Sequence, residues 1–445
     1  MGSDGTRFRN EVSVKGAFMN PKRSGRRQFL KKAAAIAGLA AGSGSLPANL
    51  EAEPVPERID DLHAYGERSH FVNSLRTGSI NNPERHLENE PQIFGLKTPL
   101  QDSVGMITPS SLHFINSHGF EPPDIDPAEH RLIIHGLVDR PLMLTMDELK
   151  RLPFESRFHF IECHGNSNPS GAFGTARLSP DATVQDTHGF TSCSQWTGVS
   201  LSLLLKEAGV QESASWIIAE GADPNKHSKS IPMGKAMEDV LVAYGQNGEP
   251  IRPEQGFPLR LVVPGWQGIN NVKWLRRIGV VDEPYMSNLE STKYPSLKLD
   301  GKSHWFENQM GPKSVITRPS GGQRLPGYGF YEITGLAWSG AGAIRRVEVS
   351  IDGGRTWKDA KLHNPVLRMA HTRFSLPWKW NGEEVVLQSR CTDEEGVVQP
   401  TLKEVAKLWG TDIDYFRKIT LTLANFNAIQ PWKVHSDGSV QNALY

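Results

Sequence analysis

Short apolar runs broken by turn residues fill the middle of the chain. The segment HRLIIHGLVDRPLMLTMDELKRLP (130–153) predicts two strands and then a helix over Met146–Leu152, with Thr145 as its N-cap. The run LSLLLKEAGV (201–210) predicts a helix that ends at its glycine. Residues 257–284 predict a strand, a glycine-rich loop and a second strand. This part of the chain therefore mixes strands with short helices.

A different pattern begins after a shift in composition near 290–312. The runs FYEITGLAWSG, IRRVEVSIDGG and EVVLQSRCTDEEG are strand-like and are separated by turn residues. Strands repeating at a spacing of about 8 to 12 residues are typical of β-sandwiches. The last third of the chain is therefore predicted to form a sandwich.

The N-terminal segment SGRRQFLKKAAAIAGLAAGSGSLPA has the pattern of a twin-arginine export signal. Arg26 and Arg27 precede a mildly apolar run and then small residues suited to cleavage. We predict a signal peptide over 1–52, an extended polar lead-in over 53–94, and a mature protein in the periplasm. A basic, alanine-rich starting helix is the alternative. No later stretch reaches about 18 apolar residues, so no membrane span is expected in the mature chain.

Composition limits the remaining possibilities. A length of 445 residues suggests two or three domains with full cores. The formal net charge is zero, so nothing favours nucleic acid as a partner. Three cysteines do not make a disulfide framework, although a periplasm is oxidising.

One of the cysteines, Cys163, stands where the strand-like run RFHFIE enters the loop HGNSNPSG. A strand that ends in a loop often places a functional side chain. No second cysteine or histidine lies at zinc-binding spacing, since Cys193 is 30 residues away. The residues alone leave three possibilities: a buried inert cysteine, a single thiolate ligand of a metal, or a nucleophile.

Five segments resemble, in order, the sulfite oxidase family of molybdenum enzymes: IECHGNS, QWTGVSLSLLLKEAG, SIPMGKAM, LVAYGQNGEPIRPEQGFPLRLVVPGWQGINNVKWLRRI and GLAWSGAGAIRRVEVSIDGGRTW. The resemblance covers about residues 100–435. It implies one molybdenum–molybdopterin cofactor per chain, with Cys163 as the sole protein ligand of the metal. A lone thiolate suffices because the pterin contributes its own sulfurs.

The resemblance also supplies a set of cofactor-binding residues. They are Phe114, Ile115, Asn116, Ser117, His118, Gln255, Arg260, Asn271, Val272 and Lys273. Gln255 stands where sulfite oxidases have a histidine, which puts that contact in question. Tyr244 matches the active-site tyrosine of the family, and simple packing is the alternative for it. Surface exposure is the alternative for Arg260 and Lys273, and His164 is interpreted as solvated or structural.

The departures from the family concern the substrate. Sulfite oxidases surround their anion with arginines, and the three matching places here hold Asn116, Ser167 and a small residue near Ala343. A pocket without arginines fits the sulfane dehydrogenase branch of the family, in which the substrate sulfur is carried on a cysteine of a carrier protein. Asn116 is therefore a candidate catalytic residue beside Cys163 and Tyr244. A periplasmic sulfite dehydrogenase is the alternative, and a non-catalytic molybdenum-binding scaffold, or a sandwich domain used mainly for docking, is a third hypothesis.

The resemblance finally implies an architecture and partners. We expect an α+β molybdopterin-binding domain over 95–295 and an immunoglobulin-like dimerisation domain over 300–435. The sequence has no C-x-x-C-H motif, so this chain is predicted to carry no haem of its own. The expected assembly is a homodimer core that passes electrons to a c-type cytochrome subunit, with a sulfur-carrier protein as substrate.

Overall fold

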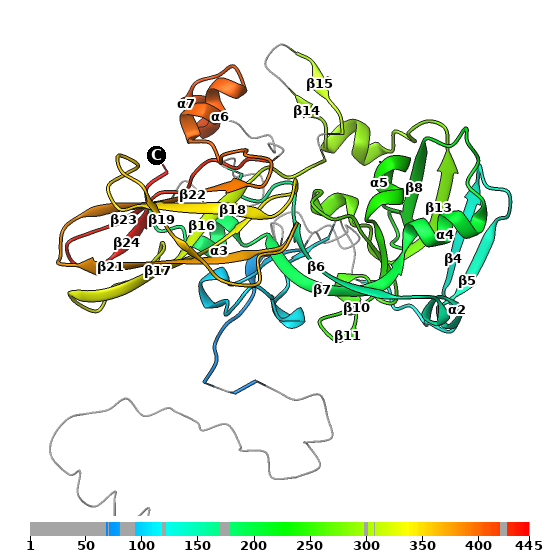
Figure 1. Cartoon of the computed structure of the whole chain (residues 1–445), viewed down its shortest axis with the longest axis horizontal. Helices are drawn as coiled ribbons and strands as arrows, with labels where there is room; N and C mark the ends of the chain where they lie inside the picture. The colour runs from blue at the N-terminus through cyan, green and yellow to red at the C-terminus, as the bar shows by residue number, and fades with distance from the viewer. Residues whose placement is uncertain are drawn as a thin grey trace, which may run out of the picture. The chain divides into compact units, whose positions relative to one another are not determined.

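The computed structural model describes residues 68–69, 71–80, 94–117, 122–168, 179–297, 301–306, 308–418 and 425–444. The predicted export signal and most of the lead-in lie outside the described residues. Figure 1 shows the strands and helices by label. Among the residues described, no helix has the length and apolar character that a membrane span requires.

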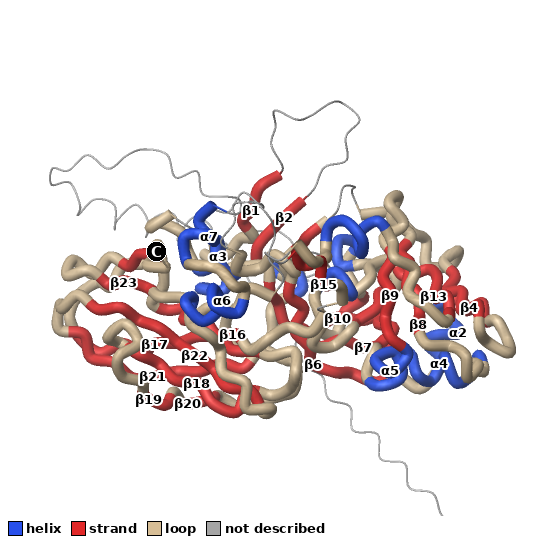
Figure 2. The backbone as a smooth tube through the Cα atoms, turned by 90° about the horizontal axis from the view of Figure 1, so that it is seen from above, coloured by secondary structure: helices blue, strands red, loops and turns tan. Residues whose placement is uncertain are grey.

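One five-stranded sheet of the first domain has the order β5-β4-β13-β8-β9. Its strands are β4 (Arg131–Gly136), β5 (Leu142–Thr145), β8 (Trp216–Gly221), β9 (Ser228–Pro232) and β13 (Leu275–Val281). Only the β13–β4 pair is parallel. Helices α4 (Leu201–Ala208) and α5 (Met233–Glu238) lie beside each other along this sheet (Figure 2). Apolar residues of the sheet and of both helices share one buried cluster.

A second sheet of this domain includes the strand that leads into the loop beginning at Cys163. Its strands are β6 (Glu155–Glu162), β7 (Thr191–Ser200), β10 (Leu241–Gln246), β11 (Glu249–Pro250) and β12 (Arg260–Val262). They pair in the order β11-β10-β7-β6, and β12 also pairs with β10. A smaller sheet joins β1 (Thr77–Ile80), β2 (Phe94–Lys97) and β3 (Ile115–Asn116).

Both helix boundaries predicted from the sequence are confirmed to within a residue. Helix α2 covers Met146–Arg151, and the Thr145 hydroxyl and the Glu148 carboxylate form a reciprocal capping box. Helix α4 is closed by Gly209 at φ +70°, a left-handed conformation that glycine adopts without a steric penalty. The other α-helices among the described residues are α3 (Val184–His188), α6 (Leu402–Leu408) and α7 (Ile413–Lys418).

The C-terminal part forms the predicted β-sandwich. One layer contains β16 (Lys313–Arg318), β17 (Gly329–Trp338), β20 (Lys361–Leu362) and β21 (Thr372–Trp380). The other contains β18 (Ile344–Ser350), β19 (Lys358–Asp359), β22 (Val385–Asp393), β23 (Trp432–Val434) and β24 (Val440–Asn442). Buried side chains of both layers, among them Trp338, Trp380 and Trp432, fill the space between them. A short hairpin of β14 (Ser296–Leu297) and β15 (Ser303–His304) lies between the two domains in the chain.

Candidate active site

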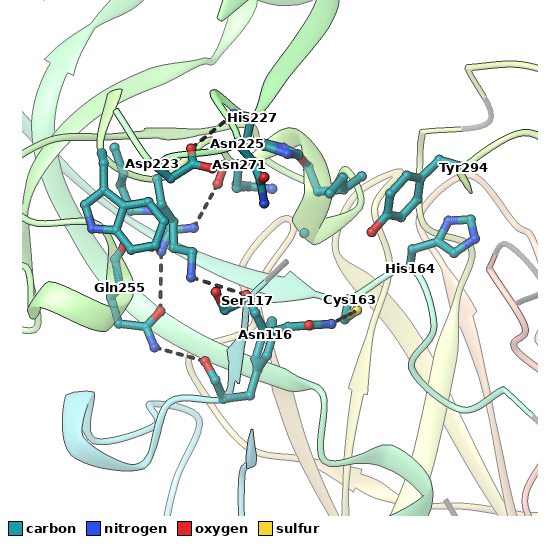
Figure 3. Close-up of a pocket in the computed structure, with 16 residues that line it drawn as sticks. Asn116, Ser117, Cys163, His164, Asp223, Asn225, His227, Gln255, Asn271 and Tyr294 are labelled. Carbon is teal, nitrogen blue, oxygen red and sulfur yellow. Dashed lines mark hydrogen bonds between the residues drawn. The ribbon is translucent and has the colours of Figure 1, made fainter. Parts of the chain in front are cut away.

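A cavity of about 830 Å³, partly open to solvent, lies where loops from the first domain converge (Figure 3). Eight of the twelve residues predicted from the sequence line it: Phe114, Asn116, Ser117, Cys163, Gln255, Arg260, Asn271 and Lys273. These residues come from the end of β3, the end of β6 and the segment around β12 and its following loop. The tertiary structure therefore joins three distant stretches of sequence into one site.

Cys163 lies at the cavity wall, directly after β6, and is 6% exposed. Its backbone N–H donates to the Phe190 carbonyl at 2.9 Å, and its carbonyl accepts from the Asn166 N–H at 2.9 Å. Asn116 Nδ2 donates to its Sγ at 3.1 Å. Burial raises the pKa of this thiol, and the hydrogen bonds from the Gly165 backbone and from Asn116 oppose that rise. The sulfur is thus held in a fixed position with a donor that favours its thiolate form.

The other two cysteines are placed differently. Cys193 and Cys391 are completely buried in the apolar cluster of the sandwich side of the structure. Burial raises the pKa of Cys193 to about 12 and also raises that of Cys391. Among the described residues that line the cavity, Cys163 is the only cysteine. It is therefore the thiol available to a metal.

Two cations, buried Arg260 and half-buried Lys273, form the opposite wall. Arg260 donates from Nη1 to the Gln255 carbonyl at 2.9 Å and from Nη2 to the Asn271 carbonyl at 3.2 Å. Its guanidinium lies 4.8 Å from the centre of the Trp196 ring, while its Nε has no hydrogen-bond partner. Lys273 Nζ donates to the carbonyls of Asn116 and Glu254 at 3.3 and 3.1 Å.

No carboxylate among the described residues lies within 4.0 Å of either cation in an ion pair. Burial lowers the pKa of Arg260 to about 9. Burial, and then the charge of Arg260, lower the pKa of Lys273 to about 7. One buried and one half-buried cation without a counter-charge are costly, so the wall is suited to an anion such as a phosphate. The surface-exposure alternative for both residues is wrong.

Amides frame this wall. Gln255 Nε2 donates to the Phe114 carbonyl at 2.9 Å, which ties the segment before β3 to the Arg260 side of the cavity. Asn271 Oδ1 accepts from the Val263 N–H at 2.8 Å, and its Nδ2 donates to the Gln267 carbonyl at 3.1 Å. The predicted set is incomplete in three places. Ile115 and Val272 do not line the cavity, since Val272 packs in the apolar core, and His118 lies outside the described residues.

The structure does not place Tyr244 at the cavity. This residue lies on β10, next to a bulge between Ala243 and Gly245, and packs against the apolar cluster of the first domain. The tyrosine that lines the cavity is Tyr294, which follows a turn of π-helix over Leu289–Lys293. Its hydroxyl points into the cavity on the side of Cys163 (Figure 3). Burial, and then the negative charge of Cys163, raise the pKa of Tyr294 well above its ordinary value.

His164 is also at the site, contrary to the expectation that it is solvated or merely structural. Its side chain is buried, lines the cavity, and its Nδ1 lies 3.0 Å from Gln267 Oε1. Its ring meets the Tyr294 ring edge to face at 4.9 Å between centroids. The adjacency of His164 to Cys163 was the signal available in the sequence, but a strand pattern alone would turn neighbours to opposite sides. The chain is in a turn at this point, so both residues reach the cavity.

Other residues that line the cavity belong to a loop in which the sequence analysis found no motif. Asp223, Asn225 and His227 lie between β8 and β9. Asp223 Oδ1 accepts from the His227 N–H at 3.1 Å, and His227 Nε2 lies 2.9 Å from the Ile269 carbonyl. These contacts tie the β8–β9 loop to the glycine-rich loop. Asp223, Asn225 and His227 thereby add polar groups to the cavity lining.

Comparisons with known proteins agree with this site. Residues 118–289 match the model of an oxidoreductase molybdopterin binding domain, and residues 305–423 match a Mo-co oxidoreductase dimerisation domain. Sulfite oxidase of Gallus gallus is 31% identical over 68% of this chain and 70% of its own length. Nitrate reductase [NADH] 2 of Phaseolus vulgaris is 33% identical over 68% of this chain, but the match spans only 37% of that enzyme. The crystal structure of the sulfane dehydrogenase SoxCD from Paracoccus pantotrophus superposes with a TM-score of 0.77 at 37% identity, covering 90% of this chain and 99% of that one.

Proposed function

Since this chain belongs to the sulfite oxidase family of molybdopterin-dependent oxidoreductases, we propose that it oxidises sulfane sulfur bound to a carrier-protein cysteine. Oxygen comes from water, and the electrons pass to a c-type cytochrome. The likeness to the sulfane dehydrogenase supports this branch of the family. The observation that carries the proposal is that, among the residues that the structure describes, no arginine or lysine lines the Cys163 side of the cavity.

The described residues fit the cofactor of the family. Cys163 offers one fixed sulfur to a metal, and Arg260 and Lys273 offer two cations to the pterin phosphate. The unpartnered Nε of Arg260 is a donor that such a phosphate would satisfy. When bound, the molybdenum–pterin cofactor supplies the two-electron oxidation and the oxygen transfer.

The side chains around Cys163 then position and protect the reacting sulfur. Asn116 holds Sγ through its amide, so the ligand keeps one orientation. Tyr294 remains a neutral phenol at any physiological pH because its pKa is raised, so its hydroxyl can donate a hydrogen bond into the cavity. His164 packs on the Tyr294 ring and restricts its rotation.

The charge around the Cys163 side differs from that of a sulfite pocket. The arginine and lysine lining the described cavity, Arg260 and Lys273, belong to the cofactor wall. Asn116 contacts the ligand sulfur, and Ser167 is buried at φ +63° with no partner for its hydroxyl. Arg346 of the sandwich is exposed and pairs with Asp359. A free anion would lose its hydration here with little in return, whereas a sulfur on a protein arm gains binding energy remote from the metal.

The test compares the two substrates. With the cytochrome acceptor present, we expect the specificity constant for persulfide on a carrier cysteine to exceed that for free sulfite by at least about 100-fold, the value of one or two charge-assisted contacts. Asn116→Arg should raise sulfite turnover and lower turnover of the loaded carrier. A sulfite specificity constant equal to or above that of the carrier would refute the proposal. It would favour a sulfite dehydrogenase, which the similarity to sulfite oxidases makes the second candidate.

Tyr294 provides a prediction within the site. Tyr294→Phe removes a hydroxyl that points into the cavity, so turnover should fall roughly 10- to 100-fold while metal content is unchanged. Tyr244→Phe is the matched control, because the same atom is removed from a ring outside the cavity. Steady-state kinetics of both variants checks the assignment. A larger loss in Tyr244→Phe than in Tyr294→Phe would restore the assignment made from the sequence.

The proposed setting is a periplasm, entered by the twin-arginine route. The support is Arg26 and Arg27 before a weakly apolar run, together with a cofactor that must be inserted before export. Changing both arginines to lysine should leave cofactor-loaded protein in the cytoplasm, measured by cell fractionation and metal content. Undiminished export of the double variant would contradict this setting. The matched dimerisation domain supports a homodimer core.

A further inference from the structure

A buried carboxylate stands directly before the metal ligand. Glu162 is the last residue of β6 and is 0% exposed. Its Oε1 accepts from Lys313 Nζ at 2.5 Å, and its Oε2 accepts from Trp338 Nε1 at 2.7 Å. Lys313, on β16, is 1% exposed, and Trp338 ends β17. The donors of this carboxylate therefore belong to the sandwich, although Glu162 belongs to the first domain.

The same carboxylate holds the Cys163 loop. Glu162 Oε1 also accepts from Asn166 Nδ2 at 2.8 Å, and Asn166 Oδ1 accepts from the Phe190 N–H at 3.0 Å. Asn166 closes the turn that begins at Cys163 through its backbone N–H. The contacts of Lys313 with Glu162, and of Glu162 with Asn166, form a continuous path from the sandwich to the ligand loop.

A second contact between the domains supports the facing loop. Gly265, at φ +72°, lies so close to Gly340 that an added Cβ would be 2.2 Å from the Gly340 carbonyl oxygen. The Met310 N–H donates to the Gly265 carbonyl at 2.9 Å, and the Gln267 N–H donates to the Asn308 carbonyl at 2.8 Å. The next residue, Gly268, lines the cavity. Both loops that border Cys163 are thus built against the sandwich.

We propose that the Glu162–Lys313 ion pair is a positioning element for the metal ligand, through which the sandwich domain sets the geometry and the electrostatic environment of Cys163. The proposal rests on the proposed function only in taking Cys163 as the ligand of molybdenum. Neither residue touches the cavity, so both act through the Cys163 loop. Loss of one partner leaves a buried charge of one sign near the metal, and loss of both leaves none.

The electrostatics of the pair give opposite signs for the two single variants. The carboxylate of Glu162 directly precedes Cys163, and the ammonium of Lys313 that pairs with it is equally buried, so the two opposite charges compensate each other beside the ligand. In Glu162→Gln the remaining cation should stabilise the reduced, more negative metal and raise its midpoint potential. In Lys313→Met the remaining carboxylate should lower that potential. The double variant should return close to wild type.

The experiment uses the full-length chain in two forms. In the cofactor-free protein each single variant should lower Tm by roughly 5 to 10 °C, and the double variant should recover much of that loss. In the loaded enzyme, a redox titration of the bound molybdenum should show the opposite shifts. Glu155→Gln, on the same strand but in a half-exposed pair with Arg157, is the matched control and should change neither quantity.

Each outcome decides between the alternatives. Additive Tm losses in the double variant would show that the two residues do not act as a pair, and the proposal would fail. The proposal would also be refuted if both single variants, at full metal content, shifted the midpoint potential in the same direction or did not shift it. The ion pair would then stabilise the fold without influencing the metal ligand. A wild-type chain that binds no molybdenum would instead refute the proposed function, and the Tm cycle would still report the contact between the domains.

Discussion

Cys163→Ser will lose its molybdenum and nearly all of its turnover, by more than about 100-fold. A serine hydroxyl remains protonated where the thiol can ionise, and it is a hard oxygen donor in place of a polarisable sulfur. The loss should be specific to the ligand, because the backbone contacts of this residue with Phe190 and Asn166 do not involve the side chain. Metal and pterin content per chain, measured with turnover, checks the prediction.

Cys193→Ser and Cys391→Ser are the matched controls for this change. Both make the same substitution at a buried cysteine, but these two thiols lie in the apolar cluster and do not line the cavity. Each control should lower Tm somewhat, because a hydroxyl is buried in place of a sulfur, and should keep the metal. Turnover of Cys163→Ser within a few-fold of wild type would refute the role of this residue as ligand.

Lys273→Met will weaken retention of the pterin by roughly 10- to 100-fold, the value of one charge-assisted contact to a phosphate. The same change should not destabilise the cofactor-free protein, because Lys273 is half-buried with a lowered pKa and has no ion-pair partner among the described residues. A residue that binds the cofactor should lose pterin without a loss of Tm, whereas a residue that only stabilises the fold should lower Tm. Pterin fluorescence released on denaturation measures the first quantity, and Tm of the cofactor-free chain measures the second.

The pH dependence of the stability of the cofactor-free protein also tests the role of Lys273. The pKa of Lys273 is about 7 in the folded protein and about 10.4 in an unfolded chain, so the unfolded state binds more protons between these values. Stability of the cofactor-free protein should therefore rise between pH 7 and about 8.5, below the pKa of Arg260 at about 9. Lys273→Met should remove most of this rise. Lys235→Met, which breaks an ion pair with Asp239 on α5, should leave it unchanged, and an unaltered slope in Lys273→Met would contradict the prediction.

Local features of the fold follow from the sequence alone. The cap at Thr145 and the end of α4 at Gly209 depend on residues within one turn of each other, so their patterns are sufficient. The strands of the sandwich follow from alternation along each run, because a strand with one buried face must alternate. The position of Cys163, after a strand and before a loop rich in small and polar residues, was equally visible.

The sequence also predicted most of the cavity lining around Asn116, Arg260 and Lys273, because these residues belong to contiguous motifs that keep their spacing in the fold. It did not determine which tyrosine reaches the cavity. Tyr244 lies in a strand-like motif, but the bulge beside it and its packing leave it outside the cavity. Tyr294 follows an irregular turn in a polar stretch without periodicity, and its place at the site depends on tertiary contacts such as the packing of its ring against His164.

The contact between Glu162 and Lys313 was decided by the tertiary structure alone, because 151 residues separate them. Nothing in the run RFHFIE or in the run KSVITR indicates that a charge on one will meet a charge on the other. Patterns of burial, capping and turn chemistry report interactions over a few residues. Whether two distant charged residues such as Glu162 and Lys313 meet depends on how the two domains pack against each other. A charge buried between the domains is tolerated only when a residue of the other domain neutralises it.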